Sequence, residues 1–183
     1  MEIEATKKQE IENLANLKLE EFNLNVPGFD LIFFLQDKEN FKIIWENMEE
    51  DTTGFVIVND DKNISETNSR KIIAININLL NEPSFIQRRR FIVAHEYAHT
   101  QLHKKDAKLY AHRDISKKET CEEKEADYFA SCFLMPKHLI EVELQKEKVK
   151  KMDESSKIKY LSDLFNVTTK KMKNRLLEIN YAK

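Results

Sequence analysis

The sequence contains, at residues 90–103, the stretch RFIVAHEYAHTQLH, in which two histidines stand four positions apart and a glutamate follows the first. Positions i and i+4 of a helix share one face and lie about 6 Å apart along its axis. His95 and His99 can therefore direct two ring nitrogens to one metal ion at the roughly 2.0–2.1 Å that zinc requires. Glu96 is rotated about 100° from His95, so its carboxylate flanks the metal and can accept a proton from water.

An ordinary amphipathic helix that carries histidine by chance is the alternative interpretation. The chain has only five histidines in 183 residues, so two at this spacing around a glutamate favour a metal-dependent hydrolytic site. His103 continues the same face at i+8. It lies about 12 Å from His95 along a straight helix, which is too far to share one ion. We therefore expect His103 to be an outer hydrogen-bonding partner or a packing residue.

A third protein ligand is expected from a neighbouring element, because a catalytic zinc usually takes three and leaves one position for water. The next helix, CEEKEADYFASCFLMP at residues 121–136, is the obvious supplier. Glu122 and Glu123 both lie one turn before its apolar stripe, while Glu125 falls further towards solvent. Spacing gives Glu123 only a modest advantage over Glu122. Asp127 follows Glu123 at i+4 and can orient a liganding histidine.

The two segments together, RRRFIVAHEYAHTQLH at residues 88–103 and EKEADYFASCFLMP at residues 123–136, resemble the ImmA/IrrE family of metallopeptidases. The family signature is R-F-x-x-A-H-E-x-x-H, then E-x-E-A-[ND]-x-F-A and L-M-P. The resemblance covers about residues 71–136 and implies a zincin-like core. It implies Zn²⁺ as cofactor with His95, His99 and Glu123 as ligands, and Glu96 as catalytic base. Asp127 stands where many relatives have Asn.

The resemblance also implies the kind of reaction and partner. It predicts hydrolysis of a peptide bond in a protein substrate, a helix-turn-helix repressor of a mobile element or stress response, so that the chain acts as an anti-repressor in transcription regulation. The competing hypothesis is a DNA-binding or protein-interaction regulator with a structural zinc, which a fourth protein ligand such as Cys121 would favour. Candidates for assisting the oxyanion are Tyr110, His112 and the arginines near position 90.

The rest of the chain predicts an α+β fold. Helices are expected at about 5–22, after Asp30, through 85–103 with Ser84 as N-cap, and over 118–135. Three β-rich runs, FKIIWE, GFVIVN and KIIAININ, favour a mostly antiparallel three-stranded sheet because the gaps between them are loop-length. Residues 71–78 alternate as a half-exposed strand should. The resemblance to zincins implies that the exposed face of this strand is a candidate for pairing with a substrate strand. A loop is expected around 104–116.

The C-terminal part reads as a separate unit, so we predict a zincin-like domain with N-terminal helices at 1–136 and a helical subdomain at 137–183. Residues 137–183 contain 12 Lys and Arg against 7 Asp and Glu. The segment IKYLSDLFNVTTKKMKNRLLEI resembles a helix-turn-helix with Thr168 as a cap. Its candidate phosphate-binding residues are Lys170, Lys171, Lys173 and Arg175. The charge excess is modest, so a packed helical subdomain is favoured over direct nucleic-acid binding.

Composition limits the remaining function classes. Hydrophobic residues make up 41% and charged residues 34% of the chain, and the formal net charge is −2. This is typical of a globular protein without overall attraction to nucleic acid or anionic lipid. No apolar run is long enough for a signal peptide or a membrane span. Two cysteines at positions 121 and 132 are poorly placed for a disulfide, so a cytoplasmic location is expected. The oligomeric state is left open.

Overall fold

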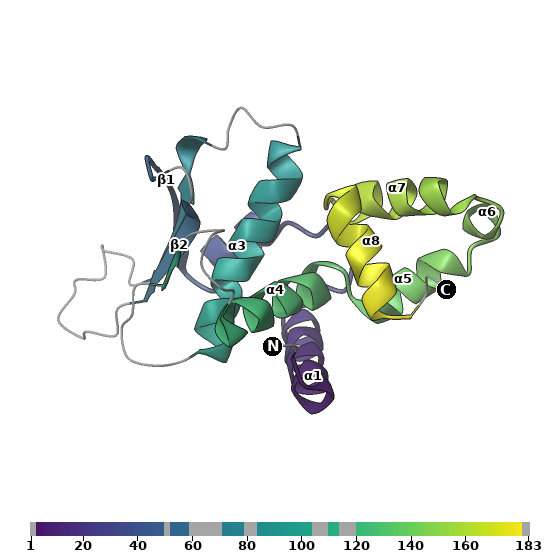
Figure 1. Cartoon of the computed structure of the whole chain (residues 1–183), viewed down its shortest axis with the longest axis horizontal. Coiled ribbons are helices and arrows are strands. Elements are labelled where there is room, and N and C mark those ends of the chain that lie inside the picture. Colours follow the sequence, from purple (N-terminus) through teal and green to yellow (C-terminus); the bar gives the residue numbers. More distant parts are fainter. Residues whose placement is uncertain are drawn as a thin grey trace.

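The structure is a computed structural model that describes residues 3–49, 52–58, 71–78, 84–103, 110–113 and 120–180, with only the backbone described for 110–113. Its elements, in chain order, are α1 (Ala5–Glu21), α2 (Leu31–Asp37), β1 (Phe41–Glu46), β2 (Thr52–Val58), β3 (Lys71–Asn76), α3 (Phe85–Leu102), β4 (Tyr110–Arg113), α4 (Cys121–Leu134), α5 (Lys137–Leu144), α6 (Glu147–Lys150), α7 (Glu154–Leu164) and α8 (Thr169–Glu178). The α+β class is confirmed. Figure 1 shows the sheet on one side of α3 and the C-terminal helices α5–α8 on the other.

Capping residues start the helices largely where the sequence predicts. Asp30 accepts a hydrogen bond from the backbone N–H of Phe33, and Thr168 accepts one from that of Lys171, which satisfies N–H groups left over in the first turn. Ser84 occupies the N-cap position of α3 but makes no capping hydrogen bond with its side chain. Its backbone is left-handed, with φ 62° and ψ 24°, rather than extended as an N-cap requires.

The sheet has the strand order β1-β3-β2-β4, so β3 lies inside it rather than at an edge. β2 pairs antiparallel with both β3 and β4, whereas β1 pairs parallel with β3. The sheet is therefore mostly antiparallel, but it has a fourth strand. The predicted use of β3 as a partner for a substrate strand is wrong, because both of its sides already carry backbone pairs. The sequence prediction relied on the lengths of the loops between strands. Loop length limits how consecutive strands can be connected, but it does not determine which strand lies in the centre of the sheet.

Strand β3 is buried on both faces, which contradicts the predicted half-exposed strand. Ile73 and Ile75 are 0% exposed on the face that joins the hydrophobic core. On the opposite face Ala74 is 0% and Asn76 1% exposed. Asn76 donates its amide N–H groups to the carbonyl oxygens of Glu49 and Thr52, at 3.0 and 2.6 Å, so its burial leaves those donors satisfied.

Strand β4 lies within the segment that the sequence predicts as a loop. It pairs with β2 at the edge of the sheet, with Thr52 opposite Arg113 and Phe55 opposite Ala111. The register shifts between these pairs, as a β-bulge would produce. A strand this short has too few residues to display a two-residue alternation, so periodicity could not reveal it.

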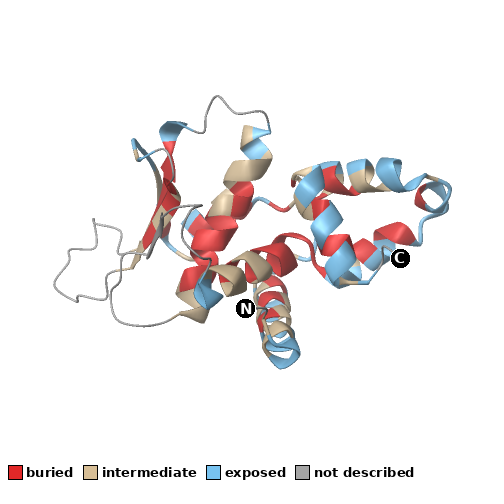
Figure 2. Ribbon diagram, viewed as in Figure 1, coloured by how far each residue is buried: buried red, intermediate tan, exposed pale blue. Residues whose placement is uncertain are grey.

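The core forms where α3 and α4 cross, and Figure 2 shows buried residues gathered along both helices. Tyr97 of α3 is 0% exposed, and its ring makes edge or tilted contacts with the rings of Phe34, Phe41, Phe129 and Phe133. The Tyr97 hydroxyl donates to Glu39 Oε1 at 2.9 Å. The helix that carries the two histidines is thereby fixed from behind by aromatic packing.

The C-terminal helices are attached to the core by buried contacts. Arg175 of α8 is 0% exposed and donates to the carbonyl oxygen of Met135 and to the carboxylate of Glu12 in α1. Gly28, with φ +68°, lets the chain before α2 approach α7, since a Cβ at this position would lie 2.7 Å from the carbonyl oxygen of Leu164. The division into units at residue 136 stays a prediction. Within the described residues, no helix is both long and apolar enough to cross a membrane.

Candidate metal centre

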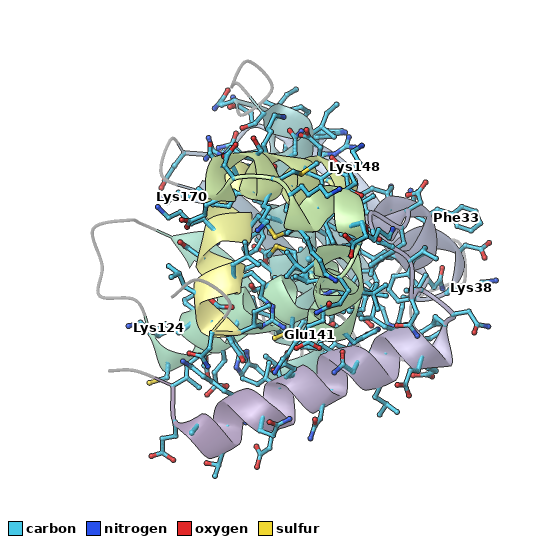
Figure 3. All side chains as sticks on the ribbon, turned by 90° about the vertical axis from the view of Figure 1, so that its right-hand side faces the viewer. Phe33, Lys38, Lys124, Glu141, Lys148 and Lys170 are labelled. Atoms are coloured by element: carbon cyan, nitrogen blue, oxygen red, sulfur yellow. The ribbon has the colours of Figure 1, made fainter. Side chains whose placement is uncertain are left out.

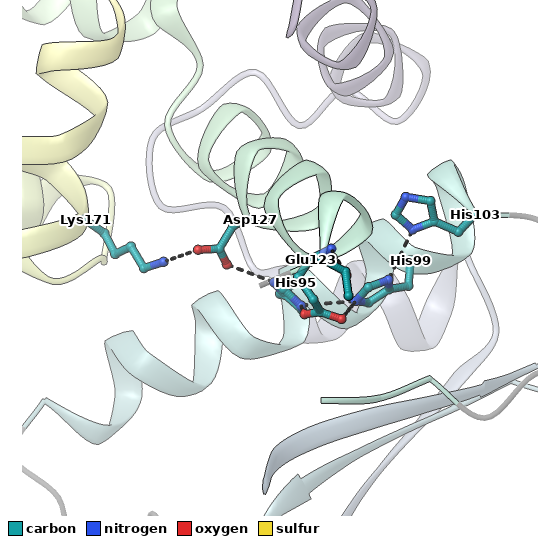
Figure 4. Close-up of polar contacts among 7 residues, drawn as sticks. His95, His99, His103, Glu123, Asp127 and Lys171 are labelled. Carbon is teal, nitrogen blue, oxygen red and sulfur yellow. Dashed lines mark hydrogen bonds and ion pairs between the residues drawn. The ribbon is translucent and has the colours of Figure 1, made fainter. Parts of the chain in front are cut away.

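Three side chains from two helices converge at one point. His95 and His99 come from consecutive turns of α3, and Glu123 comes from the first turn of α4 (Figure 4). One ligand atom from each lies within 4.8 Å of the other two. The Nε2 atoms of His95 and His99 are 3.1 Å apart. Glu123 brings Oε2 to 3.0 Å from His95 Nε2 and Oε1 to 3.5 Å from His99 Nε2.

These separations fit a bound divalent metal. Ligand atoms arranged tetrahedrally at about 2.0–2.1 Å from a zinc ion are about 3.3 Å from one another. The three measured separations of 3.0, 3.1 and 3.5 Å lie close to that value. Two imidazoles and one carboxylate are also a common donor set for zinc in hydrolases. Within the described residues, this group contains no fourth protein ligand.

Asp127 contacts His95 on the side of the ring that faces away from the other two ligands. Its Oδ1 lies 2.9 Å from His95 Nδ1, so that nitrogen carries the donated proton and Nε2 is left to face the other two ligands. Burial alone would lower the pKa of His95, but hydrogen bonds to Asp127 and Glu123 raise it to about 10. The carboxylates of Asp127 and Glu123 that stabilise positive charge on His95 would also attract a cation to this position.

Lys171 of α8 contacts the other oxygen of the Asp127 carboxylate. Its Nζ lies 3.0 Å from Asp127 Oδ2 and 3.5 Å from the centre of the Phe91 ring. Burial would raise the pKa of Asp127, but His95 and Lys171 lower it to about 2, so the carboxylate stays ionised. The sequence placed Lys171 among candidate phosphate-binding residues and gave no signal of this contact.

His103 supports the second histidine in a similar way. Its Nδ1 lies 3.2 Å from His99 Nδ1, and its Nε2 lies 3.2 Å from Glu125 Oε2. A proton on His103 Nε2 directed at Glu125 leaves its Nδ1 to accept from His99, whose Nε2 then faces the metal position. The sequence predicts Glu125 on the solvent side and gives no signal of this contact, because the contact depends on how α3 and α4 cross.

Glu96 lies beside the ligands and is 1% exposed. It faces β2 at Gly54, where a Cβ would lie 3.6 Å from Glu96 Oε1, 3.0 Å from Ile92 Cγ2 and 2.9 Å from the carbonyl oxygen of Ala74. Only a residue without a side chain lets the strand approach the helix this closely. The close approach holds β2 against the carboxylate that the sequence predicts as the base.

A groove of about 1020 Å³ opens onto this site. His95, Glu96 and Glu123 line one part of it, and the first turns of α8 line another. Of the remaining sequence candidates, Glu122 is exposed and outside the metal-binding group.

The candidates for assisting an oxyanion have different positions. Arg90 donates to the carbonyl oxygen of Phe29 at 2.6 Å and stacks on its ring, so it serves packing. Arg88 lines the groove, whereas Arg89 lies over the ring of Trp45. The side chains of Tyr110 and His112 lie outside the described residues.

Comparison with known proteins identifies the family. A family model described as Peptidase_M78, IrrE N-terminal-like domain, matches residues 37–177. The chain belongs to this metallopeptidase family. Its His-His-Glu group is intact at His95, His99 and Glu123. The resemblance to the ImmA/IrrE family seen in the sequence is therefore confirmed.

A solved structure has a similar fold. It is a Mycobacterium tuberculosis transcriptional regulator with a TM-score of 0.53 and 16% sequence identity, covering 92% of this chain and 46% of that chain. The chain thus spans about half the length of that regulator, and the likeness concerns the fold alone. No curated protein matches the sequence.

Proposed function

We propose that this M78-family chain is a zinc-dependent endopeptidase that cleaves a protein substrate inside the cell, a helix-turn-helix transcriptional repressor. The observation that carries the proposal is the convergence of His95, His99 and Glu123 beside Glu96, at a groove large enough for a polypeptide segment. The repressor as substrate rests on the family resemblance. The intracellular location is supported by two free cysteines, Cys121 and Cys132.

The ligand set provides a place for zinc and a defined role for each side chain. His95 and His99 would hold the metal through Nε2, and Asp127 and His103 keep the two rings in the orientation that exposes those atoms. Zinc bound there would supply Lewis-acid chemistry, polarising the scissile carbonyl and making water more acidic. The same donors suit other divalent metals, so zinc is part of the proposal.

Glu96 is the residue that moves the proton. A carboxylate oxygen of Glu96 takes a proton from the attacking water and then delivers it to the amide nitrogen of the leaving chain. Its burial beneath β2 at Gly54 excludes bulk water from one side of the carboxylate. The groove that opens onto the site leaves room for the substrate on the other side.

The alternative, a regulator with a structural metal and no peptidase activity, has less support. Two of the basic residues that would contact phosphate are already engaged, Lys171 with Asp127 and Arg175 with Glu12. Within the described residues, the ligand group also lacks the fourth protein donor that a structural zinc site normally has.

The decisive experiment incubates the zinc-loaded chain with the helix-turn-helix repressors of its own cell. We expect a single cut that a chelator abolishes and added zinc restores. Glu96→Gln should bind one zinc per chain, measured by elemental analysis, and leave the repressor whole. Intact repressor under all conditions, with zinc bound to the wild-type chain, would contradict the proposal. Cleavage by Glu96→Gln at the wild-type rate would exclude Glu96 as the base.

A further inference from the structure

We infer that the first turns of α8 form a wall of the substrate groove, and that Lys170 in this wall selects substrates with an acidic side chain on one side of the cleaved bond. The inference rests on the proposed peptidase function and adds a substrate class to it. It assigns a role in recognition to a helix that the sequence places in a separate helical subdomain.

The groove joins the metal centre to α8. It is lined by His95 and Glu96 of α3, by Asp127 of α4, and by Thr169 and Lys170 of α8. Its volume of about 1020 Å³ exceeds what a single side chain occupies. A substrate chain whose peptide bond lies at Glu96 can therefore extend along the groove and reach α8.

The wall is held firmly in place relative to the site. Lys171 joins α8 to Asp127 through an ion pair of 3.0 Å and also packs on the ring of Phe91. One helical turn further on, Arg175 is 0% exposed and donates to Met135 of the core. These contacts, made by the residues that follow Lys170 in α8, keep the backbone of this helix at a fixed distance from the metal centre.

The charges along the groove favour an acidic ligand. Its basic lining residues are Lys8, Arg88, Lys124, Lys170 and Lys171, and its acidic ones are Glu96, Glu123, Asp127 and Glu178. Each acid already has a task or a partner. Glu96 and Glu123 belong to the proposed reaction centre, Asp127 lies between His95 and Lys171, and Glu178 contacts Ser131 and Arg175.

Lys170 supplies a positive charge that the protein itself does not neutralise. It is exposed, and the described part of the chain contains no ion-pair partner for it. Figure 3 shows Lys170 and Lys124, one from α8 and one from α4, on the same side of the molecule. A substrate carboxylate beside Lys170 would gain an ion pair at the rim of the groove, where charge acts mainly on selection.

Lys173 is the matched control. It is exposed on the same helix, one turn from Lys170, but it does not line the groove. Lys170→Glu and Lys173→Glu change the net charge equally and alter α8 at neighbouring exposed positions. A general effect of charge or helix stability would appear in both variants, whereas recognition in the groove would be lost only in the first.

The test uses peptides prepared from a denatured cell extract as the substrate mixture, with zinc-loaded full-length protein. Cut sites that appear with the wild-type chain and not with Glu96→Gln are identified by mass spectrometry. We expect Asp and Glu to be enriched on one side of these sites. The enrichment should persist in Lys173→Glu and disappear, or change to Lys and Arg, in Lys170→Glu.

A second measurement separates recognition from folding. For one acidic peptide from the mixture, Lys170→Glu should lower kcat/KM about tenfold, mainly through KM. Replacing the acidic residue of that peptide by Lys should restore cleavage by Lys170→Glu. Cleavage without acidic preference, or equal behaviour of the two variants, would overturn the inference and leave the peptidase intact. Absence of any Glu96-dependent cut would instead count against the proposed function itself.

Discussion

Lys171 Nζ lies 3.0 Å from Asp127 Oδ2, although the two residues are 44 positions apart in the chain. Asp127 in turn lies 2.9 Å from His95 Nδ1, so a C-terminal helix contacts the metal centre through one carboxylate. Figure 4 shows Lys171, Asp127 and His95 in a row. Because Asp127 is shared, its replacement should affect both metal binding and the attachment of α8.

Asp127→Ala should weaken zinc binding about 10-fold or more, since the His95 ring loses the acceptor that fixes its tautomer and orientation. Asp127→Asn should weaken it much less, because the amide oxygen can still accept from His95 Nδ1. Competition with a chromophoric zinc chelator measures both affinities. Equal losses in the two variants would mean that the charge of Asp127, not its hydrogen bond to His95, determines affinity.

Lys171→Met should lower the free energy of unfolding by about 1 kcal/mol, because α8 loses a charged hydrogen bond to Asp127 and a cation–π contact with Phe91. Met preserves much of the apolar contact with the ring. The exposed Lys173→Met is the control and should change stability by less than about 0.5 kcal/mol. Urea denaturation measures both, and equal stabilities would show that Lys171 does not hold α8.

Sequence reasoning found the parts of the site that lie on one helix and left open those that depend on packing. The spacing of His95 and His99 fixes their common face whatever surrounds the helix. Glu122 and Glu123 differ by about 100° of rotation, and only the angle at which α4 crosses α3 selects between them. Lys171 was invisible to sequence reasoning because no local pattern encodes a contact across 44 residues.

The sheet illustrates the same limit. The run at 71–76 alternates well enough to suggest one exposed face, yet Ala74 and Asn76 are buried on that face. The Ala74 side chain is small enough to be covered by neighbouring parts of the same chain. The Asn76 amide donates hydrogen bonds to the backbone carbonyls of Glu49 and Thr52. A polar residue in a strand therefore does not establish exposure when local backbone acceptors are within reach.

Gly54→Ala should destabilise the fold and reduce hydrolysis together. The added Cβ would lie 2.9 Å from the Ala74 carbonyl oxygen and 3.0 Å from Ile92, so β2 and α3 must separate. Overpacking of this kind costs about 1–3 kcal/mol. The separation would also move β2 away from the Glu96 carboxylate, which this strand covers. Thermal denaturation and cleavage assays measure the two effects; wild-type stability with wild-type activity would contradict the tight approach at Gly54.

Arg175→Met should destabilise the protein by about 3 kcal/mol, because removal of the buried Arg175 leaves the part-buried Glu12 carboxylate and the Met135 carbonyl without their donor. Arg175→Lys should recover part of this loss, since it keeps the charge but not the several directed N–H groups. Urea denaturation gives the comparison. If Arg175→Met left stability unchanged, Arg175 would not link the helices, and its interpretation as a phosphate contact would be favoured instead.

The two cysteines should differ sharply in reactivity. Cys121 is exposed at the start of α4, whereas Cys132 is 1% exposed on the same helix. Burial raises the pKa of the Cys132 thiol to about 12, an effect that nearby Arg175 only partly opposes. The thiolate is the reactive form, so at pH 8 Cys132 is held as the unreactive thiol, and its burial blocks access as well.

A thiol-specific colorimetric reagent at pH 8 should therefore titrate one equivalent quickly in the native protein and a second only after unfolding. Arg175→Met should accelerate the second reaction, because loosening α8 from the core opens the path to Cys132, whereas Lys173→Met should leave it slow. Cys121→Ser identifies the fast equivalent. Two equivalents at the same rate in the native chain would mean that the α4–α8 contact does not seal this part of the core.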